Sequence, residues 1–246
     1  MPTRADALVL DEADPLSTWR DQFVIADPAL VYLDGNSLGM MPKRTIDRIE
    51  RVLRDEWAAG LVRSWDHWVD LPQKVGDRLA PLIGARPGEV VVHDSTTVNI
   101  YQLVDAACAL NPERRVIAIG PADFPTDRYV VAGIAAARGL QVRDDFERLD
   151  DVAVMVRSVV DYRTAELADV VGETARASAA GAIVLWDLSH AAGVVPVDLA
   201  AAGVQFAVGC TYKYLNGGPG SPAFSYVAHE LQATMPQPIW GWFAQV

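Results

Sequence analysis

The stretch "GCTYKYLNGGPG" (Gly209–Gly220) places a lysine between two tyrosines, directly after the apolar run "VQFAV" and before a glycine-rich segment. The chain has only three lysines, at positions 43, 74 and 213. A lysine at the end of a buried strand is either a solvated loop charge or an amine nucleophile at the edge of a site. The glycines would let the backbone approach a ligand closely. What the rest of the chain brings to the same edge decides between these two interpretations.

From residue 89 onward, short β-branched runs alternate with helical patterns. The predicted strands are "EVVVHD" (89–94), "RRVIAIG" (114–120), "VAVMVRSVV" (152–160), "AIVLWDLSH" (182–190), "VQFAVGC" (204–210) and "PAFSYVAH" (222–229). Helices are expected between them, including residues 128–139 and 164–181. Strands that are apolar on both faces indicate a mostly parallel sheet covered by helices on both sides. The fold class is therefore α/β.

The first 60 residues have a different pattern. "VYLDGNSLGMMP" (31–42) predicts a short strand that leads into a turn. Residues 45–59 predict a helix with an apolar stripe of Ile46, Ile49, Leu53 and Trp57. We expect an N-terminal arm and first helix (1–60), a large domain (61–235) and the start of a C-terminal region (236–246).

Composition excludes several classes of function. The chain of 246 residues has a formal net charge of −11, so it lacks the basic face that nucleic-acid binding requires. No apolar run reaches the length of a membrane span, and acids stand where a signal peptide would be apolar. The two cysteines lie in apolar runs and are expected to be reduced thiols, which favours a cytoplasmic setting. The four histidines are too scattered to predict a metal site.

Polar residues come directly after the predicted strands, and in a parallel sheet these strand ends meet at one edge. Ser95, Thr96 and Thr97 begin a helix, where an anion such as phosphate binds, although plain N-capping would use the same residues. Asp187 comes after a buried strand, and Lys213 comes after another. An anion site, a strand-end acid and a lysine suit pyridoxal 5′-phosphate (PLP), which needs a phosphate site, a carboxylate for its ring nitrogen and an amine.

Several motifs in this order resemble those of the kynureninases, fold-type I PLP enzymes of the aminotransferase superfamily. They are "YLDGNSLG" (32–39), "STTVN" (95–99), "FPTD" (124–127), "DYRT" (161–164), "WDLSHAAGVVPVDL" (186–199) and "CTYKYLNGGPGSPAF" (210–224). The resemblance runs from about residue 10 to residue 243. It implies the large domain of fold-type I PLP enzymes.

The resemblance also implies roles for individual residues. Lys213 would hold PLP covalently and then act as the catalytic base, and Asp187 would pair with the ring nitrogen. Asp127 would be a second acid near that nitrogen, His190 would lie beside the ring near its phenolic oxygen, and Phe124 would stack on the ring. Seven more positions match family sites: Thr96, Thr97 and Tyr212 for the phosphate, Ser158 and Trp242 for other cofactor contacts, and Asn36 and Ser37 for the substrate side.

The reaction implied is hydrolysis of kynurenine or 3-hydroxykynurenine to anthranilate or 3-hydroxyanthranilate and alanine. This reaction belongs to tryptophan catabolism and, through the kynurenine pathway, to NAD biosynthesis. The family also implies a homodimer, in which the counterpart of Trp242 reaches in from the partner subunit. Two alternatives stay open: another fold-type I enzyme, aminotransferase-like or desulfurase-like, and a cofactor-binding remnant without catalysis. Against a desulfurase, no cysteine comes after Lys213.

The chain departs from the family pattern in two places. It stops at "IWGWFAQV" (239–246), where the family continues into a smaller C-terminal domain with an arginine for the substrate carboxylate. We therefore expect a truncated chain that lacks this domain, exposes the apolar surface it would have covered, and has doubtful activity by itself. The other departure is Ala165, where the family usually has glycine.

Overall fold

A seven-stranded sheet forms the body of the protein in the computed structural model, which describes residues 2–242. The strand order is β1-β7-β6-β5-β4-β2-β3. The strands are β1 (Val90–His93), β2 (Val116–Ile119), β3 (Gln141–Arg143), β4 (Val152–Ser158), β5 (Ile183–Asp187), β6 (Phe206–Gly209) and β7 (Ala223–Val227).

All strands except β7 run in the same direction. β7 pairs antiparallel with both β1 and β6, and the other pairs are parallel, so the prediction of a mostly parallel sheet is confirmed. The six predicted strands are present. The seventh, β3, was not predicted, because this short edge strand is largely exposed and lacks a continuous apolar run.

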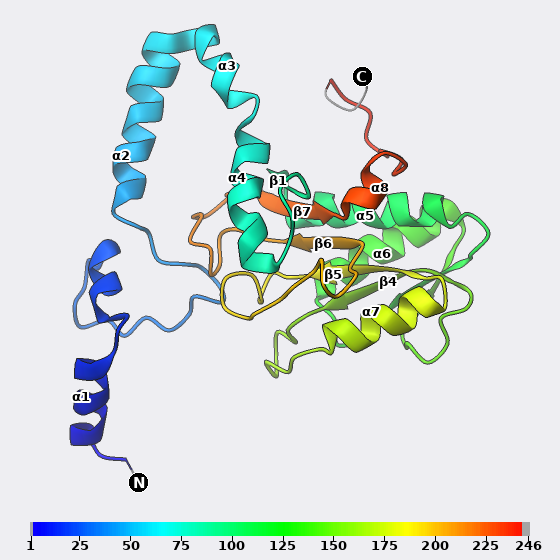
Figure 1. Ribbon diagram of the computed structural model, residues 1–246, viewed down its shortest axis with the longest axis horizontal. Coiled ribbons are helices and arrows are strands. Elements are labelled where there is room, and N and C mark those ends of the chain that lie inside the picture. The colour runs from blue at the N-terminus through cyan, green and yellow to red at the C-terminus, as the bar shows by residue number, and fades with distance from the viewer. Residues whose placement is uncertain (1, 243–246) are drawn as a thin grey trace.

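Helices cover both faces of the sheet, as Figure 1 shows. On one face, α5 (Thr96–Leu110) and α6 (Pro125–Arg138) bury Ile100, Val104 and Ile134 against the strands. On the other face lie α7 (Val170–Ala179), α4 (Leu71–Leu79) and η4 (Ala80–Ile83). There the fully buried Trp186 of β5 donates its indole N–H to Thr174 Oγ1 of α7 at 3.0 Å. The central strands are therefore apolar on both sides, because helices pack on both faces of the sheet.

Helix α7 is shorter than the predicted helix 164–181. Residues before it form a loop, in which the Asp161 carboxylate accepts hydrogen bonds from the backbone N–H groups of Arg163 and Thr164 at 2.8 and 2.9 Å. Asp169 then caps α7 by accepting from Gly172 N at 2.9 Å. Side-chain capping of the backbone competes with helix formation, which explains why the helix begins later than its pattern predicts.

The N-terminal segment projects away from the sheet (Figure 1). It contains α1 (Arg4–Ala13), η1 (Ser17–Gln22) and α2 (Arg44–Arg51), and α2 continues into the π-helix η2 (Val52–Gly60). Two short turns of helix, η3 (Leu61–Ser64) and α3 (Trp65–Trp68), lead back to α4, and α8 (His229–Gln232) comes after β7. The predicted helix 45–59 is thus present, but its second half has the wider π geometry.

The strand predicted at the start of residues 31–42 is wrong. Val31 and Leu33 are exposed and lie in irregular backbone, because no neighbouring strand offers them hydrogen bonds. The turn predicted after it is present, with Ser37 N and Leu38 N both donating to Asp34 O.

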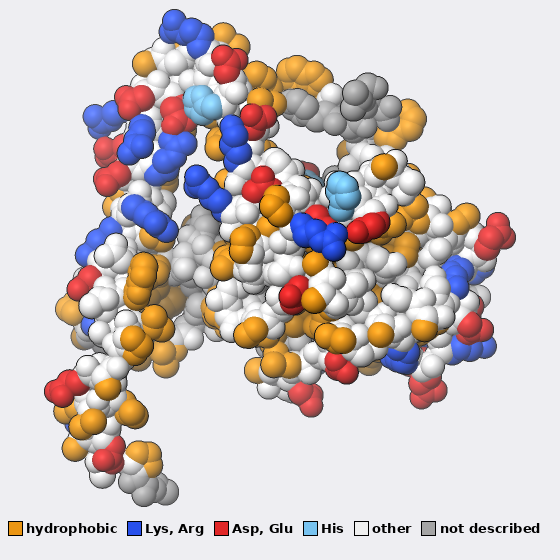
Figure 2. Space-filling model, viewed as in Figure 1, with side chains coloured by type: hydrophobic (Ala, Val, Ile, Leu, Met, Phe, Trp, Pro, Cys, Tyr) orange, Lys and Arg blue, Asp and Glu red, His pale blue; other side chains and the backbone are white. Residues whose placement is uncertain are grey.

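The apolar stripe of α2 and η2 lies on the surface. Ile46, Ile49, Leu53 and Trp57 are all exposed, and so are Leu8 and Val9 of α1. Figure 2 shows hydrophobic side chains among charged ones on the projecting N-terminal segment. A surface of this kind marks a site of association with another surface.

Residues 2–242 contain neither a membrane-spanning helix nor a metal-binding cluster. In this part of the chain, no helix combines the length and the apolar character needed to cross a bilayer. The same residues include no group of three or more histidine, cysteine or acidic side chains arranged to hold a metal ion.

Ala165 offers a direct test of the loop before α7. Its φ of 60° is in the left-handed region, which costs a residue with a Cβ atom about 1 kcal/mol relative to glycine. We expect Ala165→Gly to raise the free energy of unfolding, measured by urea denaturation, by about 0.5–1 kcal/mol.

The matched control is Ala132→Gly, at an exposed position in the middle of α6 with right-handed helical backbone. It should lower the free energy of unfolding by about 1 kcal/mol. Equal destabilisation by both substitutions would contradict the assignment of strain to Ala165.

Candidate active site

A cavity of about 190 Å³ lies at the edge of the sheet where the parallel strands end. Its lining comes from four separate segments of the chain, and it includes eight of the twelve residues to which the family resemblance gives roles. The lining residues are Ser95, Thr96, Thr97, Phe124, Thr126, Asp127, Asp187, Ser189, His190, Tyr212 and Lys213. The chain thus brings together side chains that are more than 100 residues apart in the sequence.

Lys213 belongs to the connection between β6 and β7, and only 8% of its surface is exposed. The loop is braced across its base: Gly217 N donates to Thr211 O at 2.8 Å, and Thr211 Oγ1 lies 2.6 Å from Ser221 Oγ. Asn216 N donates to the Lys213 carbonyl at 3.0 Å. This bracing holds the amine of Lys213 inside the cavity, so the interpretation as a solvated loop charge is wrong.

His190 is the direct partner of this amine. Its Nε2 lies 2.9 Å from Lys213 Nζ. Burial lowers the pKa of His190, and the neighbouring positive charge of Lys213 lowers it further; the Asp187 charge and a hydrogen bond with the backbone of Asn36 act in the opposite direction. A neutral imidazole accepts a hydrogen bond at Nε2 from the lysine ammonium.

Asp187 and Asp127 form a buried acid pair at the floor of the cavity. Asp187 Oδ1 accepts from Ser189 N at 2.8 Å and from Ser189 Oγ at 2.6 Å. Asp127 lies in the first turn of α6, and its Oδ2 is buried without a hydrogen-bond partner in the described structure. Burial raises the pKa of Asp127 strongly, and the charges of Asp187 and Asp123 raise it further, against the opposing effect of Lys213. Asp127 therefore keeps its proton to a higher pH than an ordinary aspartate, because a second buried carboxylate at close range disfavours its ionisation.

Two neighbours of this pair were not predicted from the sequence. Ser189 fixes the orientation of Asp187, and the local pattern "DLS", in which an aspartate accepts from the residue two positions later, could have indicated it. Asp123 is a third buried acid, and its Oδ1 accepts from Ser158 N at 2.9 Å. No local pattern predicts a contact between residues 35 positions apart.

The start of α5 lines another side of the cavity. Ser95 is the N-cap, and its Oγ accepts from Val98 N at 3.3 Å. His93 stabilises the turn before α5 through two hydrogen-bond contacts. Its Nδ1 lies 3.0 Å from Asp94 Oδ2, and its Nε2 lies 3.0 Å from Ser225 Oγ on β7. The first backbone N–H groups of a helix have no intrahelical acceptor, so they and the hydroxyls of this turn can bind phosphate oxygens.

Aromatic rings line one side of the amine. Lys213 Nζ lies 5.7 Å from the ring centre of Phe124 and 5.8 Å from that of Tyr212. Tyr162 packs edge-on against Phe124 at 5.1 Å between ring centres, and Arg163 covers the outer face of Tyr162. Phe124 is thus held in place from outside, and its ring lines the cavity as a flat apolar wall.

The turn at residues 34–39 packs against the lysine loop. Gly39 N donates to the Tyr212 carbonyl at 2.8 Å, and a Cβ atom on Gly39 would lie 2.2 Å from the Lys213 carbonyl oxygen. Asn36 contacts His190 through its backbone, whereas the Ser37 hydroxyl donates to Asp34 Oδ1 at 2.8 Å. The predicted placement of Asn36 and Ser37 on the substrate side is not tested by these contacts.

Two of the predicted cofactor contacts, Ser158 and Trp242, do not line the cavity. Ser158 is the last residue of β4 and pairs with Asp187 of β5. Its backbone N–H donates a hydrogen bond to Asp123 Oδ1. Trp242 is 82% exposed and stacks on Trp65, with 5.8 Å between ring centres. Cofactor contacts for both residues stay predictions.

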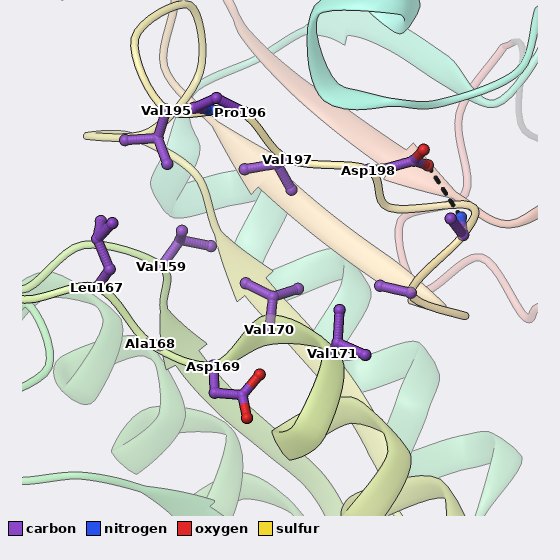
Figure 3. Close-up of a pocket in the computed structure, with 12 residues that line it drawn as sticks. Val159, Leu167, Ala168, Asp169, Val170, Val171, Val195, Pro196, Val197 and Asp198 are labelled. Carbon is purple, nitrogen blue, oxygen red and sulfur yellow. Dashed lines mark hydrogen bonds between the residues drawn. The ribbon is translucent and has the colours of Figure 1, made fainter.

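A second cavity, of about 310 Å³, lies between α7 and residues 195–202 (Figure 3). Its wall is formed mainly by valines, including Val159, Val170 and Val197. The carboxylates at its rim are engaged in capping: Asp169 accepts from Gly172 N and Asp198 from Ala201 N. It has no convergent polar groups, so its chemistry differs from that of the lysine site.

The residues that line the cavity at Lys213 are chemically suited to PLP. The Asp127–Asp187 pair has a buried oxygen without a partner and an excess of buried acid, and a cationic ring N–H would satisfy both. The helix start at Ser95 and the amine of Lys213 line the same cavity. The residues therefore provide an anion site, an acid pair and an amine for one group.

Relatives in sequence are kynureninases. No family model matches the chain. The kynureninase of Pseudomonas fluorescens is 46% identical over 258 aligned positions, which cover 99% of this chain and 62% of that protein. The kynureninase of Burkholderia pseudomallei (strain 1106a) is 46% identical over 259 positions, with the same two shares. The chain thus spans 62% of the length of these curated relatives.

Solved structures with a similar fold are cysteine desulfurases. CsdA of Escherichia coli has a TM-score of 0.72 at 20% identity, and the match covers 93% of this chain and 61% of that chain. The apo enzyme from Thermococcus onnurineus NA1 has a TM-score of 0.71 at 18% identity, covering 98% and 61%. At these identities the likeness concerns the fold alone, and it confirms the predicted large-domain architecture of fold-type I enzymes.

The raised pKa of Asp127 predicts how stability depends on pH. In the unfolded chain this carboxyl ionises near pH 4, but in the folded chain it keeps its proton to much higher pH. The unfolded state then binds fewer protons, so folding stability falls as pH rises between these two values. Asp127→Asn should raise the melting temperature of the cofactor-free chain, and the gain over the unmodified chain should grow from pH 5 to pH 8, by about 2–4 °C for each kcal/mol regained.

Asp161→Asn serves as a control of opposite sign, because two backbone N–H groups lower the pKa of this exposed carboxyl. It should lower the melting temperature, and the loss should shrink as pH falls toward 3. A gain for Asp127→Asn that does not change with pH would contradict a buried, protonated Asp127.

Proposed function

The chain is a homologue of the kynureninases along 99% of its length, and on this basis we propose that it is a PLP-dependent C–C bond hydrolase. The proposed reaction is hydrolysis of kynurenine or 3-hydroxykynurenine to anthranilate or 3-hydroxyanthranilate and alanine. The observation that carries the proposal is the buried amine of Lys213, 2.9 Å from His190 and lining one cavity with the acid pair and the α5 start.

Each wall of the cavity would hold a different part of PLP. Thr96, Thr97 and Tyr212 would bind the phosphate, which the N-terminal end of α5 also favours through its dipole. The acid pair would bind the ring nitrogen, since a protonated nitrogen can donate to a carboxylate oxygen. Phe124 would cover one face of the ring. Lys213 would form the covalent bond to the aldehyde carbon.

When bound, PLP supplies an electrophilic carbon and a ring that accepts the electrons released at the substrate's α-carbon. Asp187 would keep this capacity available by providing a carboxylate for the ring nitrogen. Lys213, once its amine is free, removes the α-proton as general base. His190 is neutral beside Lys213 Nζ, so its Nε2 accepts a hydrogen bond from the lysine and orients the amine.

A homodimer is part of the proposal. The exposed apolar stripe of α2 and η2, together with that of α1, is surface that association with a second copy would bury. An aromatic pair, Trp65 and Trp242, also lies outside the cavity of its own chain. The contact of Trp242 with PLP would then be made in the partner's cavity. A cytoplasmic location and a place in tryptophan catabolism leading to NAD biosynthesis are proposed with it.

Neither cysteine of this chain is suited to desulfurase chemistry. A desulfurase needs an accessible thiol of low pKa, but Cys108 and Cys210 are both buried. Burial raises the pKa of Cys108 to about 11 and also raises that of Cys210. Both thiols of the chain are therefore suited to packing rather than to sulfur transfer.

Substitution of Lys213 tests the covalent role. Borohydride should fix PLP on the purified chain, and any turnover of kynurenine should give anthranilate and alanine. Lys213→Ala should abolish the borohydride-fixed adduct and the activity, because no other amine lines the cavity. Lys74→Ala is the matched control, since Lys74 is an exposed lysine paired with Asp70 on α4. An adduct that survives Lys213→Ala would refute the assignment, and a keto acid in place of anthranilate would indicate an aminotransferase.

Asp187→Ala tests the ring-nitrogen role. The substituted chain should still bind some PLP through the phosphate site and Lys213, but kcat should fall by about 100-fold or more, because the carboxylate stabilises charge only during reaction. Asp70→Ala, at an exposed acid of the N-terminal half, should leave kcat unchanged. Equal rates for the Asp187→Ala chain and the unmodified chain would rule this role out.

A further inference from the structure

Asp123 is a buried acid for which the proposed chemistry has no direct use. Its side chain is 1% exposed. Oδ2 accepts from Gly120 N at 2.9 Å, at the end of β2, and Oδ1 accepts from Ser158 N at 2.9 Å, at the end of β4. β2 and β4 are neighbouring parallel strands. The carboxylate thus ties together the two strand ends just before α6 begins.

The residues immediately after Asp123 connect this anchor to the site. Phe124 is the N-cap of α6, and Asp127 is in its first turn. Both residues line the cavity at Lys213. Any displacement of Asp123 would move the aromatic wall and one member of the acid pair together, because all three are within five residues.

Arg157 is the cation that pairs with Asp123. Its guanidinium nitrogen lies 3.7 Å from Asp123 Oδ1, and its Nε donates to Glu173 Oε2 of α7 at 3.1 Å. The Arg157 side chain is 28% exposed, and it also covers the ring of Phe146. The guanidinium therefore stands between the buried acid and the solvent and offsets part of its charge.

We propose that Asp123 positions the acid pair Asp127–Asp187 for a cationic ring nitrogen. It does so in two ways: it fixes the start of α6 against β4, and it places a third buried carboxylate near Asp127. The positive charge of Arg157 offsets part of the negative charge of Asp123 and so weakens its effect on the pair. The inference about the cofactor rests on the function proposed above, whereas the effect of Asp123 and Arg157 on Asp127 does not.

The charges around Asp127 determine the sign of each effect. Asp187 and Asp123 act on Asp127 as negative charges, and Lys213 acts as a positive one. The remaining titratable groups near this end of the cavity, His190, Tyr212 and Cys210, are uncharged at neutral pH, because burial lowers the pKa of the first and raises those of the other two. Removing a negative charge from Asp123 makes ionisation of Asp127 easier. Removing the positive charge of Arg157 makes it harder.

The test is a titration of the cofactor-free chain by carboxyl ¹³C NMR with labelled aspartate, in which Asp127→Asn identifies the Asp127 signal. Asp123→Asn should lower the pH at which Asp127 titrates by about one unit. Arg157→Met should shift it upward. Glu173→Gln is the matched control: it removes the other partner of Arg157, on the outer side, and should shift the Asp127 titration by less than either of the first two substitutions.

A second measurement addresses the cofactor. Dissociation constants for PLP, measured by absorbance titration at pH 7.5, should rise about tenfold for Asp123→Asn and should not rise for Arg157→Met. If Asp123 were only a structural anchor, Asp123→Asn would lower the melting temperature without shifting the Asp127 titration, and the proposal would be wrong. If Asp123→Asn does not fold, the upward shift for Arg157→Met decides the question, and its absence overturns the proposal.

These results separate the two levels of inference. Failure of the unmodified chain to bind PLP, with the expected NMR shifts present, would overturn the proposed function and the inference about the cofactor, but not the effect of Asp123 and Arg157 on Asp127. Normal PLP binding without the shifts would overturn this inference alone.

Discussion

Buried charge at the end of an apolar sheet is the constraint on which this site depends. Asp187 ends β5 after four buried apolar residues, so water cannot screen its charge. It is stabilised by two hydrogen bonds from Ser189, and Asp127 responds by keeping its proton. A positive charge next to the pair would therefore be stabilised. The ammonium of Lys213 provides some of this compensation, and a protonated ring nitrogen would add to it.

The sheet makes this arrangement possible because the polar side chains that line the cavity come at or just after the ends of its strands. The central strands are largely apolar and buried, and helices pack on both faces of the sheet. The antiparallel β7 returns the chain from β6 across a braced loop, and that loop carries Lys213. A parallel continuation would have required a crossover helix in place of this short connection.

Two features of the structure lower the stability of the isolated chain and are explained by binding. An unpartnered oxygen on Asp127 and exposed apolar side chains on α2 and η2 both cost stability to the isolated chain. Neither contributes to the packing of the core. Both are explained if the chain binds further components, a cationic ring in the cavity and a second copy on the N-terminal surface. Naturally stable folds carry such costs mainly where they bind something.

Local patterns in the sequence determined the six main strands, the α/β class, the hydroxyls at the start of α5, and the strand-end residues Asp187 and Lys213. Each of these depends on neighbours within a few positions, through side-chain alternation, capping or glycine conformation. Local patterns were wrong for the strand at residues 31–34 and missed the edge strand β3. Only the tertiary structure decided that Asn36 reaches His190, that Asp123 ties β2 to β4, and that the pKa of Asp127 is raised. These depend on burial and on contacts between residues distant in the sequence, and the free energy of a buried charge is set by everything that surrounds it in space.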